Sequence, residues 1–114
     1  MSDKEHLYLL WTSGSKVTAE KMIFMYSINS LRNGWWKKVT IIIWGALALL
    51  VGEDKVLQEK IEEAKLEGVH LTACKSCADQ LGVTETLESM GIEVIYCGAP
   101  LIALLKNNEK LLTI

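Results

Sequence analysis

The chain has 114 residues, 50% of them hydrophobic, and a formal net charge of −2. This length and apolar content are enough for one domain with its own core, so we predict a single domain over residues 1–114. Acidic and basic residues are interspersed. The sequence therefore lacks a basic footprint for nucleic acid and a cationic helix for an anionic membrane surface.

The chain contains three cysteines and begins with the polar residues Ser2, Asp3, Lys4 and Glu5, without the apolar segment of a signal peptide. Disulfide frameworks are typical of secreted proteins, so we expect reduced thiols in a soluble cytoplasmic protein. The apolar run over residues 39–51 is shorter than the about 20 residues that a membrane-spanning helix needs. We therefore expect no membrane span.

The first part of the chain alternates between strand and helix patterns. The predicted elements are a buried strand at residues 6–11, a helix at 16–33 ended by Gly34, a strand at 39–43, a helix-forming segment at 46–50 after a turn at Gly45, and an amphipathic helix opened by residues 52–54 and running to residue 67. The helix at 16–33 is apolar over more than one face, which favours a homo-oligomer. Trp35 and Trp36 are expected to seal a core edge or a subunit contact.

The second part continues this alternation. The predicted elements are a strand at residues 69–73, a turn at Cys74 leading into a short helix to residue 81, a short helix capped by Thr84, a strand at 92–97, a helix from Pro100 to residue 106, and a last strand at 110–114. Strands that read as continuous apolar runs are typical of parallel sheets buried on both faces. The fold class is therefore predicted as a three-layer α/β/α domain with a five-stranded parallel sheet.

Parallel sheets of this kind place their sites beyond the carboxyl ends of the strands. The residues that follow the predicted strands are thus candidates for substrate binding or catalysis. The candidates for substrate binding are Ser13, Gly14, Trp44, Gly45, Lys75 and Gly98. The same edge gathers all three thiols, Cys74, Cys77 and Cys97.

The Cys74-x-x-Cys77 motif at a predicted strand-to-helix turn is the strongest chemical signal in the chain. Unpaired N–H groups at a helix start and the nearby Lys75 favour thiolate at Cys74 and predict a depressed pKa there. A thiolate is both a nucleophile and a metal ligand. We expect Cys74 to be exposed and to react first, with Cys77 one helical turn away on the same side.

Several interpretations of these thiols remain open. Only Cys74, Cys77, Cys97 and His70 are obvious metal ligands, and one cysteine pair is a weak zinc signal, so we predict no metal and no cofactor. A thioredoxin-like redox pair shares the strand–turn–helix setting, although the sequence shows no proline placed beside it as in such folds. Cys97 is expected to be a buried small hydrophobe, His70 to be packed in the core, and His6 to be structural.

The order of elements and four short motifs resemble the DsrE/DsrF-like (YchN-like) family over nearly the whole chain. The motifs are residues 11–14 (Trp-Thr-Ser-Gly) after the first strand, Trp44-Gly45 after the second, residues 73–78 (Ala-Cys-Lys-Ser-Cys-Ala) followed by Gly82-Val83, and residues 91–94 (Gly-Ile-Glu-Val) ahead of the last turn. The resemblance implies a parallel α/β fold, trimers or hexamers, and a persulfide on Cys74 that passes between a protein sulfur donor and acceptor, as a sulfurtransferase-like carrier.

Cys77 departs from the single carrier cysteine of the relay members of that family. A neighbouring thiol can attack a persulfide, release its outer sulfur and leave a disulfide, so Cys77 is expected to modulate transfer or release. Two alternatives stay open: a thiol–disulfide redox protein, and a non-catalytic assembly subunit with idle thiols.

Overall fold

The computed structural model describes residues 4–114; Ser2 and Asp3, which contributed to the signal-peptide prediction, lie outside the described residues. The strands are β1 (His6–Trp11), β2 (Lys38–Ile43), β3 (His70–Cys74), β4 (Glu93–Ile95) and β5 (Lys110–Thr113). The helices are α1 (Lys16–Thr18), the π-helical segment η1 (Ala19–Phe24), α2 (Met25–Arg32), α3 (Leu47–Glu53), α4 (Lys55–Leu66), α5 (Lys75–Leu81), α6 (Thr84–Ser89) and α7 (Gly98–Lys106).

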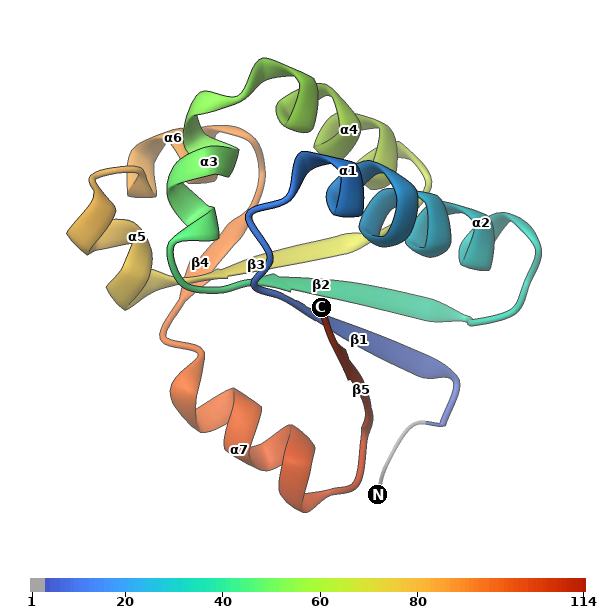
Figure 1. Ribbon diagram of the computed structural model, residues 1–114. Helices are drawn as coiled ribbons and strands as arrows, with labels where there is room; N and C mark the ends of the chain where they lie inside the picture. The colour runs from blue at the N-terminus through green and yellow to red at the C-terminus, as the bar shows by residue number, and fades with distance from the viewer. Residues whose placement is uncertain (1–3) are drawn as a thin grey trace.

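The five strands form one sheet in the order β4-β3-β2-β1-β5, and every strand pair is parallel. The helices lie on both sides of this sheet (Figure 1), so the predicted α/β/α fold class is confirmed. No helix in the described part of the chain is both long and apolar enough to cross a membrane.

The two faces of the sheet are covered unequally. Helices α1 to α6 pack on one face, whereas α7 is the only described helix on the other face (Figure 1). Successive strand residues point to opposite faces, so in β1 the buried Leu7, Leu9 and Trp11 belong to the main core. A second, smaller cluster under α7 contains Ile42 and two of the three cysteines.

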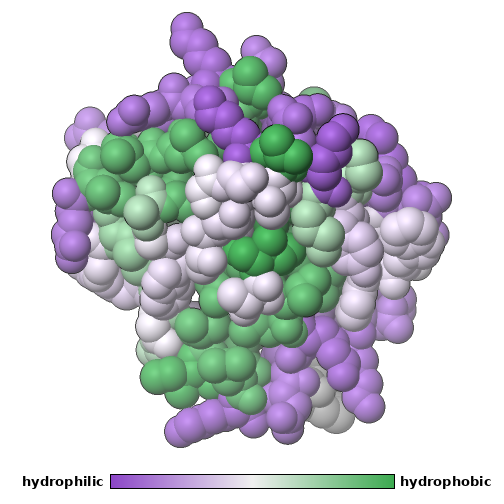
Figure 2. Space-filling view, in the orientation of Figure 1, coloured by the Kyte–Doolittle hydropathy of each residue, from purple (hydrophilic) through white to green (hydrophobic). Residues whose placement is uncertain are grey.

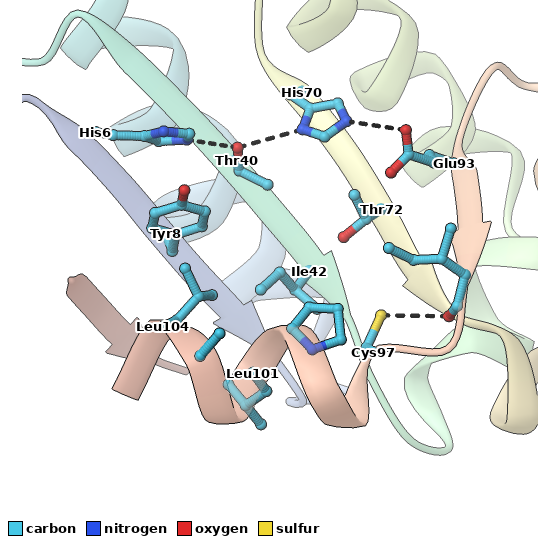
Figure 3. A pocket seen from close by; sticks show the side chains of 13 residues that line it. His6, Tyr8, Thr40, Ile42, His70, Thr72, Glu93, Cys97, Leu101 and Leu104 are labelled. Carbon is cyan, nitrogen blue, oxygen red and sulfur yellow. Dashed lines mark hydrogen bonds and ion pairs between the residues drawn. The ribbon is translucent and has the colours of Figure 1, made fainter. Parts of the chain in front are cut away.

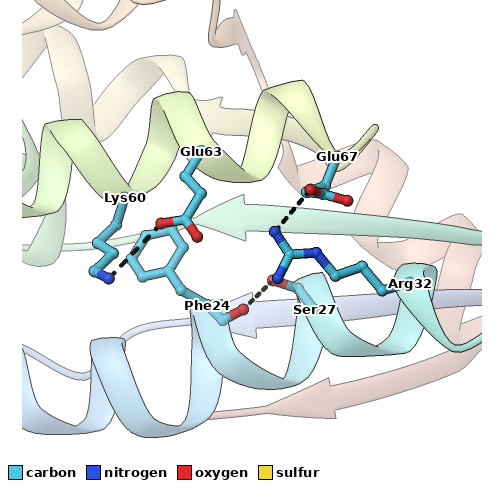
Figure 4. A network of polar contacts seen from close by, with 6 residues as sticks. All are labelled: Phe24, Ser27, Arg32, Lys60, Glu63 and Glu67. Atoms are coloured by element: carbon cyan, nitrogen blue, oxygen red, sulfur yellow. Dashed lines mark hydrogen bonds and ion pairs between the residues drawn. The ribbon is translucent and has the colours of Figure 1, made fainter.

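The wide apolar face of the first helix is used only in part inside the chain. Phe24 and Ile28 are buried, and the Phe24 ring meets the Trp11 ring edge-on with centroids 5.4 Å apart. Figure 4 shows α2 running beside α4, with the Arg32 guanidinium donating to the Glu67 carboxylate at 2.8 Å. Phe24 and Ile28 therefore pack inside the chain, whereas Val17 and Met25 are 68% and 48% exposed and leave apolar surface on this helix.

Several element boundaries differ from the prediction. Strand β3 continues to Cys74, which pairs with Ile95, and β4 ends at Ile95 because Cys97 already has helical backbone angles. Helix α7 consequently begins at Gly98, two residues before Pro100. Gly52 lies inside α3, and Asp54 caps α4 by accepting a hydrogen bond from the Leu57 backbone N–H.

Thr84 does not cap α6 as predicted. Val83 occupies the cap position, and the Thr84 hydroxyl instead donates to the Asp79 carboxylate at the end of α5. This hydrogen bond is the largest cause of the lowered pKa of Asp79. It links the two short helices that follow β3.

Candidate functional site

The three thiols meet at the carboxyl ends of β3 and β4. Cys74 is the last residue of β3, Cys77 lies in the first turn of α5, and Cys97 directly precedes α7. Cys74 and Cys97 are buried in the small cluster under α7, and the half-buried Cys77 packs against it. All three cysteines are free, and the gathering predicted from the parallel sheet is present.

Cys77 interacts directly with Cys74. Burial is the first cause of the raised pKa of Cys77, and a side-chain hydrogen bond with Cys74 is the second. A hydrogen bond from the Gly45 backbone opposes both by stabilising the Cys77 thiolate. The turn after β2 thus contacts the thiol pair, and Trp44 packs against the same cluster.

Cys97 is the most strongly perturbed of the three thiols. Burial, followed by the nearby Cys74, Cys77 and Glu93, raises its pKa to about 11. Its thiol donates to the backbone carbonyl of Ile95 with a sulfur-to-oxygen distance of 3.4 Å. Cys97 is 4% exposed, which confirms the prediction of a buried cysteine.

The burial of Cys74 contradicts the expectation of an exposed nucleophile. Only 6% of this residue is exposed, because it extends β3 by one residue on the face that α7 covers. Cys77 is more accessible than Cys74. A reagent or partner therefore reaches the Cys74 sulfur only through a small opening, or after local movement of α5 or α7.

Lys75 lies beside the thiols in sequence, but its charge is engaged elsewhere. Its ammonium nitrogen is 3.3 Å from an Asp79 carboxylate oxygen and 5.9 Å from the centroid of the Tyr96 ring. This pairing weakens the support that Lys75 can give to a thiolate at Cys74.

Gly98 follows Cys97 at the start of α7, and no atom lies within 4 Å of the position that a Cβ would take there.

Ser13 and Gly14 are not part of the thiol cluster. They follow β1, which is separated from β3 by β2 in the sheet. The Ser13 hydroxyl accepts from the Ser15 backbone N–H, and the Ser13 backbone N–H donates to the carbonyl of Ile114. Of the six predicted substrate-binding residues, Trp44, Gly45 and Gly98 lie at the thiols, Lys75 points to Asp79, and Ser13 and Gly14 lie apart.

A row of polar side chains crosses the amino-terminal half of the sheet under α7 (Figure 3). It joins His6 on β1, Thr40 on β2, His70 on β3 and Glu93 on β4. The prediction that His70 packs in the core is wrong, because its side chain is 54% exposed. The alternation of side chains along a strand was the signal available in the sequence, because it places His70 on the same face as Thr72 and Cys74. Across residues 4–114, no group of three or more His, Cys, Asp or Glu residues is arranged to hold a metal ion.

The chain is similar to the solved structure of a conserved protein of unknown function from Bacteroides thetaiotaomicron. The two are 42% identical, with a TM-score of 0.96 over 100% of this chain and 98% of the other. The chain belongs to the same family as this Bacteroides protein. No family model and no curated protein matches the chain, so the resemblance to the DsrE/DsrF-like family stays a prediction.

Proposed function

We propose that the protein is an intracellular persulfide carrier in which Cys74 accepts sulfane sulfur and Cys77 governs its fate. The observation that carries this proposal is the gathering of Cys74 and Cys77, free of a disulfide, in one cluster at the carboxyl edge of a parallel sheet. Cys77 and Cys97 both have a raised pKa and stay protonated to higher pH than ordinary thiols. This favours Cys74 as the nucleophile of the cluster.

Loading and release then follow thiol–persulfide exchange. The Cys74 thiolate attacks the outer sulfur of a donor persulfide, the donor S–S bond breaks, and the donor leaves as a thiolate. An acceptor thiolate can take the outer sulfur from the Cys74 persulfide in the same way. Alternatively, Cys77 attacks the inner sulfur, releases hydrosulfide and leaves a Cys74–Cys77 disulfide, which a dithiol or two small thiols must reduce.

The burial of Cys74 restricts the partners. A protein donor has to present its persulfide on an extended or mobile segment, because α5 and α7 leave Cys74 only 6% exposed. The half-buried Cys77 lies nearer the surface. We propose that a donor and an acceptor protein approach beside α5, where Cys77 and the Gly45 turn meet.

Intact-mass spectrometry after treatment with a persulfide donor tests the proposal. The wild-type protein should gain the mass of one sulfur atom, Cys74→Ser should gain none, and Cys77→Ser should load and hold the sulfur longer while releasing less sulfide. Cys97→Ser is the matched control, because it removes a thiol of the same cluster and should still load. Full loading of Cys74→Ser would refute the assignment.

The same pair of neighbouring free thiols also favours a second candidate, a thiol–disulfide redox protein. In that case the mild oxidation of wild type produces a reversible disulfide, either serine substitution removes it equally, and no variant gains a sulfur atom. An assembly subunit with idle thiols would show neither product.

A further inference from the structure

A cavity of about 360 Å³ lies between the sheet and α7 (Figure 3). This volume falls in the range of small-molecule sites, about 300–1,000 Å³. Its inner wall is apolar and is formed by Ile42 on β2, Ile95 on β4, and Leu101 and Leu104 on α7. Cys97, at the start of α7, lines the same part of the cavity. The interior therefore suits an apolar chain.

The opposite end of the cavity is polar and open to solvent. The side chains of His70 and Glu93 are 54% and 56% exposed, whereas Ile42 is only 6% exposed. Figure 3 shows His70 and Glu93 at one end of this group of side chains and Leu101 and Leu104 at the other. A ligand that fits this cavity is therefore amphipathic, with its polar head at the open end and its chain under α7.

The charge at the open end is negative. Glu93 is the only Asp, Glu, Lys or Arg among the residues of the range 4–114 that line the cavity. Thr72 stands in register with Glu93, and its hydroxyl oxygen is able to accept a hydrogen bond. Burial is the first cause of the raised pKa of Cys97, and the charge of Glu93 adds to it. The field of this carboxylate thus reaches the inner wall of the cavity.

The neighbouring imidazoles leave the Glu93 carboxylate open to a further donor. His70 Nε2 lies 3.8 Å from a Glu93 carboxylate oxygen, which is longer than a hydrogen bond, and this imidazole is charged only if protonated. His70 Nδ1 and His6 Nε2 both face the Thr40 hydroxyl oxygen, at 3.3 Å and 2.7 Å. A carboxylate accepts several hydrogen bonds, so a ligand can donate to Glu93 beside His70.

The nearby lysines lie too far from Glu93 to reverse this charge. Lys37 and Lys38 are exposed and line a neighbouring hollow on the β1–β2 side. Lys38 comes four residues before Ile42, which is level with Thr72 and therefore with Glu93. Strand geometry separates the Lys38 and Glu93 backbones by about 13 Å along the strands and about 10 Å across them. Salt screens exposed charges over about 8 Å, so Glu93 sets the charge of the cavity.

We propose that the cavity under α7 binds a small primary amine with an apolar chain. The ammonium group donates to the Glu93 carboxylate and to the Thr72 hydroxyl oxygen, and the chain lies along Ile42, Leu101 and Leu104. This site goes beyond the sulfur chemistry and does not depend on it. All three cysteines remain in every protein used to test it.

Calorimetric titration with octylamine, 1-octanol and octanoate compares three heads on the same chain. At about pH 7.5 the amine is protonated, and both octanoate and Glu93 are ionised. We expect octylamine to bind most tightly and octanoate at least about fivefold more weakly. In NMR of labelled methyl groups, octylamine should shift the Ile42 and Leu104 signals. Equal affinity for octylamine and octanoate, or shifts confined to Ile102 and Leu105 on the outer face of α7, would overturn the proposal.

Glu93→Gln tests the charge directly. It should weaken octylamine binding about twofold to fivefold, the modest effect of a half-exposed ion pair, and leave octanol binding unchanged. Glu59→Gln is the matched control, because it makes the same charge change at an exposed position of α4, on the other face of the sheet (Figure 1). An unchanged octylamine affinity in Glu93→Gln, or an equal loss in Glu59→Gln, refutes the site.

Leu104→Trp tests the apolar part. The larger side chain should fill the cavity and weaken the binding of octylamine and octanol at least about tenfold. Leu66→Trp is its control, because Leu66 is 88% exposed on α4. Equal octylamine affinity in these two variants would overturn the proposal.

A second copy of the chain is the other possible occupant of the cavity. Leu104 methyl signals that shift with protein concentration and are unaffected by octylamine would show such a dimer and overturn the proposal. Should Leu104→Trp fail to fold, Glu93→Gln decides, because it changes a half-exposed side chain and adds no bulk.

Discussion

Cys97 shows how burial sets the reactivity of a single thiol. Its pKa of about 11 leaves it protonated near neutral pH, and its sulfur is enclosed under α7. We expect Cys97 to be the slowest of the three cysteines to react with iodoacetamide at pH 8, because the thiolate is the reacting form. Peptide mapping after timed labelling measures the order. Labelling of Cys97 as fast as that of Cys77 would contradict this pKa.

The same shift predicts a pH dependence of stability. A thiol whose pKa is higher in the folded state than in the unfolded chain favours folding below about pH 9, and this contribution is lost as the pH rises toward about 11. The free energy of unfolding of wild type should therefore fall more steeply between those two values than that of Cys97→Ala. Urea unfolding at a series of pH values measures both slopes, and parallel slopes would show that Cys97 is not responsible.

The sequence predicted which thiols meet but not how each one is covered. Parallel strands bring Cys74 and Cys97 to one edge whatever the loops do, and that part depends only on topology. The exposure of Cys74 depends on where β3 ends and on which helix lies above it. Those features follow from the backbone angles of Cys97 and the early start of α7, which local sequence patterns do not encode.

At the scale of elements, Gly52 is a packing requirement inside α3. A Cβ at this position would lie 2.7 Å from Val83 Cγ1 and 3.0 Å from Val83 Cβ, atoms that a β-branched side chain cannot move far. Gly52→Ala should gain about 1 kcal/mol in helix propensity and lose about 1–3 kcal/mol through overpacking. We expect a net destabilisation of about 1 kcal/mol by urea unfolding.

Two further variants isolate the cause. Gly14→Ala places a methyl group where no atom lies within 4 Å, so its stability should change by less than about 0.5 kcal/mol. Combining Gly52→Ala with Val83→Ala should be less destabilising than the sum of the two single changes, because the smaller side chain removes the clash. Strict additivity would show that Val83 is not what Gly52 accommodates.

Elements with strong local signals were predicted well. Leu57, Ile61 and Ala64 form the predicted stripe of α4 and are all buried, and Gly68 has the positive φ expected after a helix end. Gly52 was placed at a helix start because glycine usually marks a boundary. Its contact with Val83 is between segments distant in sequence, which a local pattern cannot reveal.

At the scale of the whole molecule, the unequal covering of the sheet was the feature hardest to predict. Continuous apolar strands indicated helices on both faces, but they did not show that a single described helix covers one of them. Thr40, His70 and Thr72 are polar residues at alternate strand positions on that face. In the sequence, the polar residues at these alternate positions were the signal that one face of the sheet is only partly apolar.

The predicted homo-oligomer is favoured by exposed apolar residues on α7 as well as by Val17 and Met25, which are exposed on the first helix. Ile102 and Leu105 are 54% and 58% exposed on α7, and Figure 2 shows apolar residues gathered at the lower left, where α7 lies. An exposed apolar patch on a small domain favours association. We therefore expect an oligomer, with a trimer or hexamer as the state implied by the family resemblance, in light scattering at micromolar concentration.

Introducing charge at this surface tests the assembly and its location together. The double variant Ile102→Glu, Leu105→Glu should lower the measured mass to that of a monomer, because burying two carboxylates in an apolar contact is strongly unfavourable. Leu66→Glu, which adds a carboxylate at an exposed leucine of α4, should leave the mass unchanged. If the wild-type protein is a monomer in light scattering, the prediction of a homo-oligomer is wrong. An unchanged mass in the double variant would move the contact away from α7, toward the exposed Trp35 or Leu49.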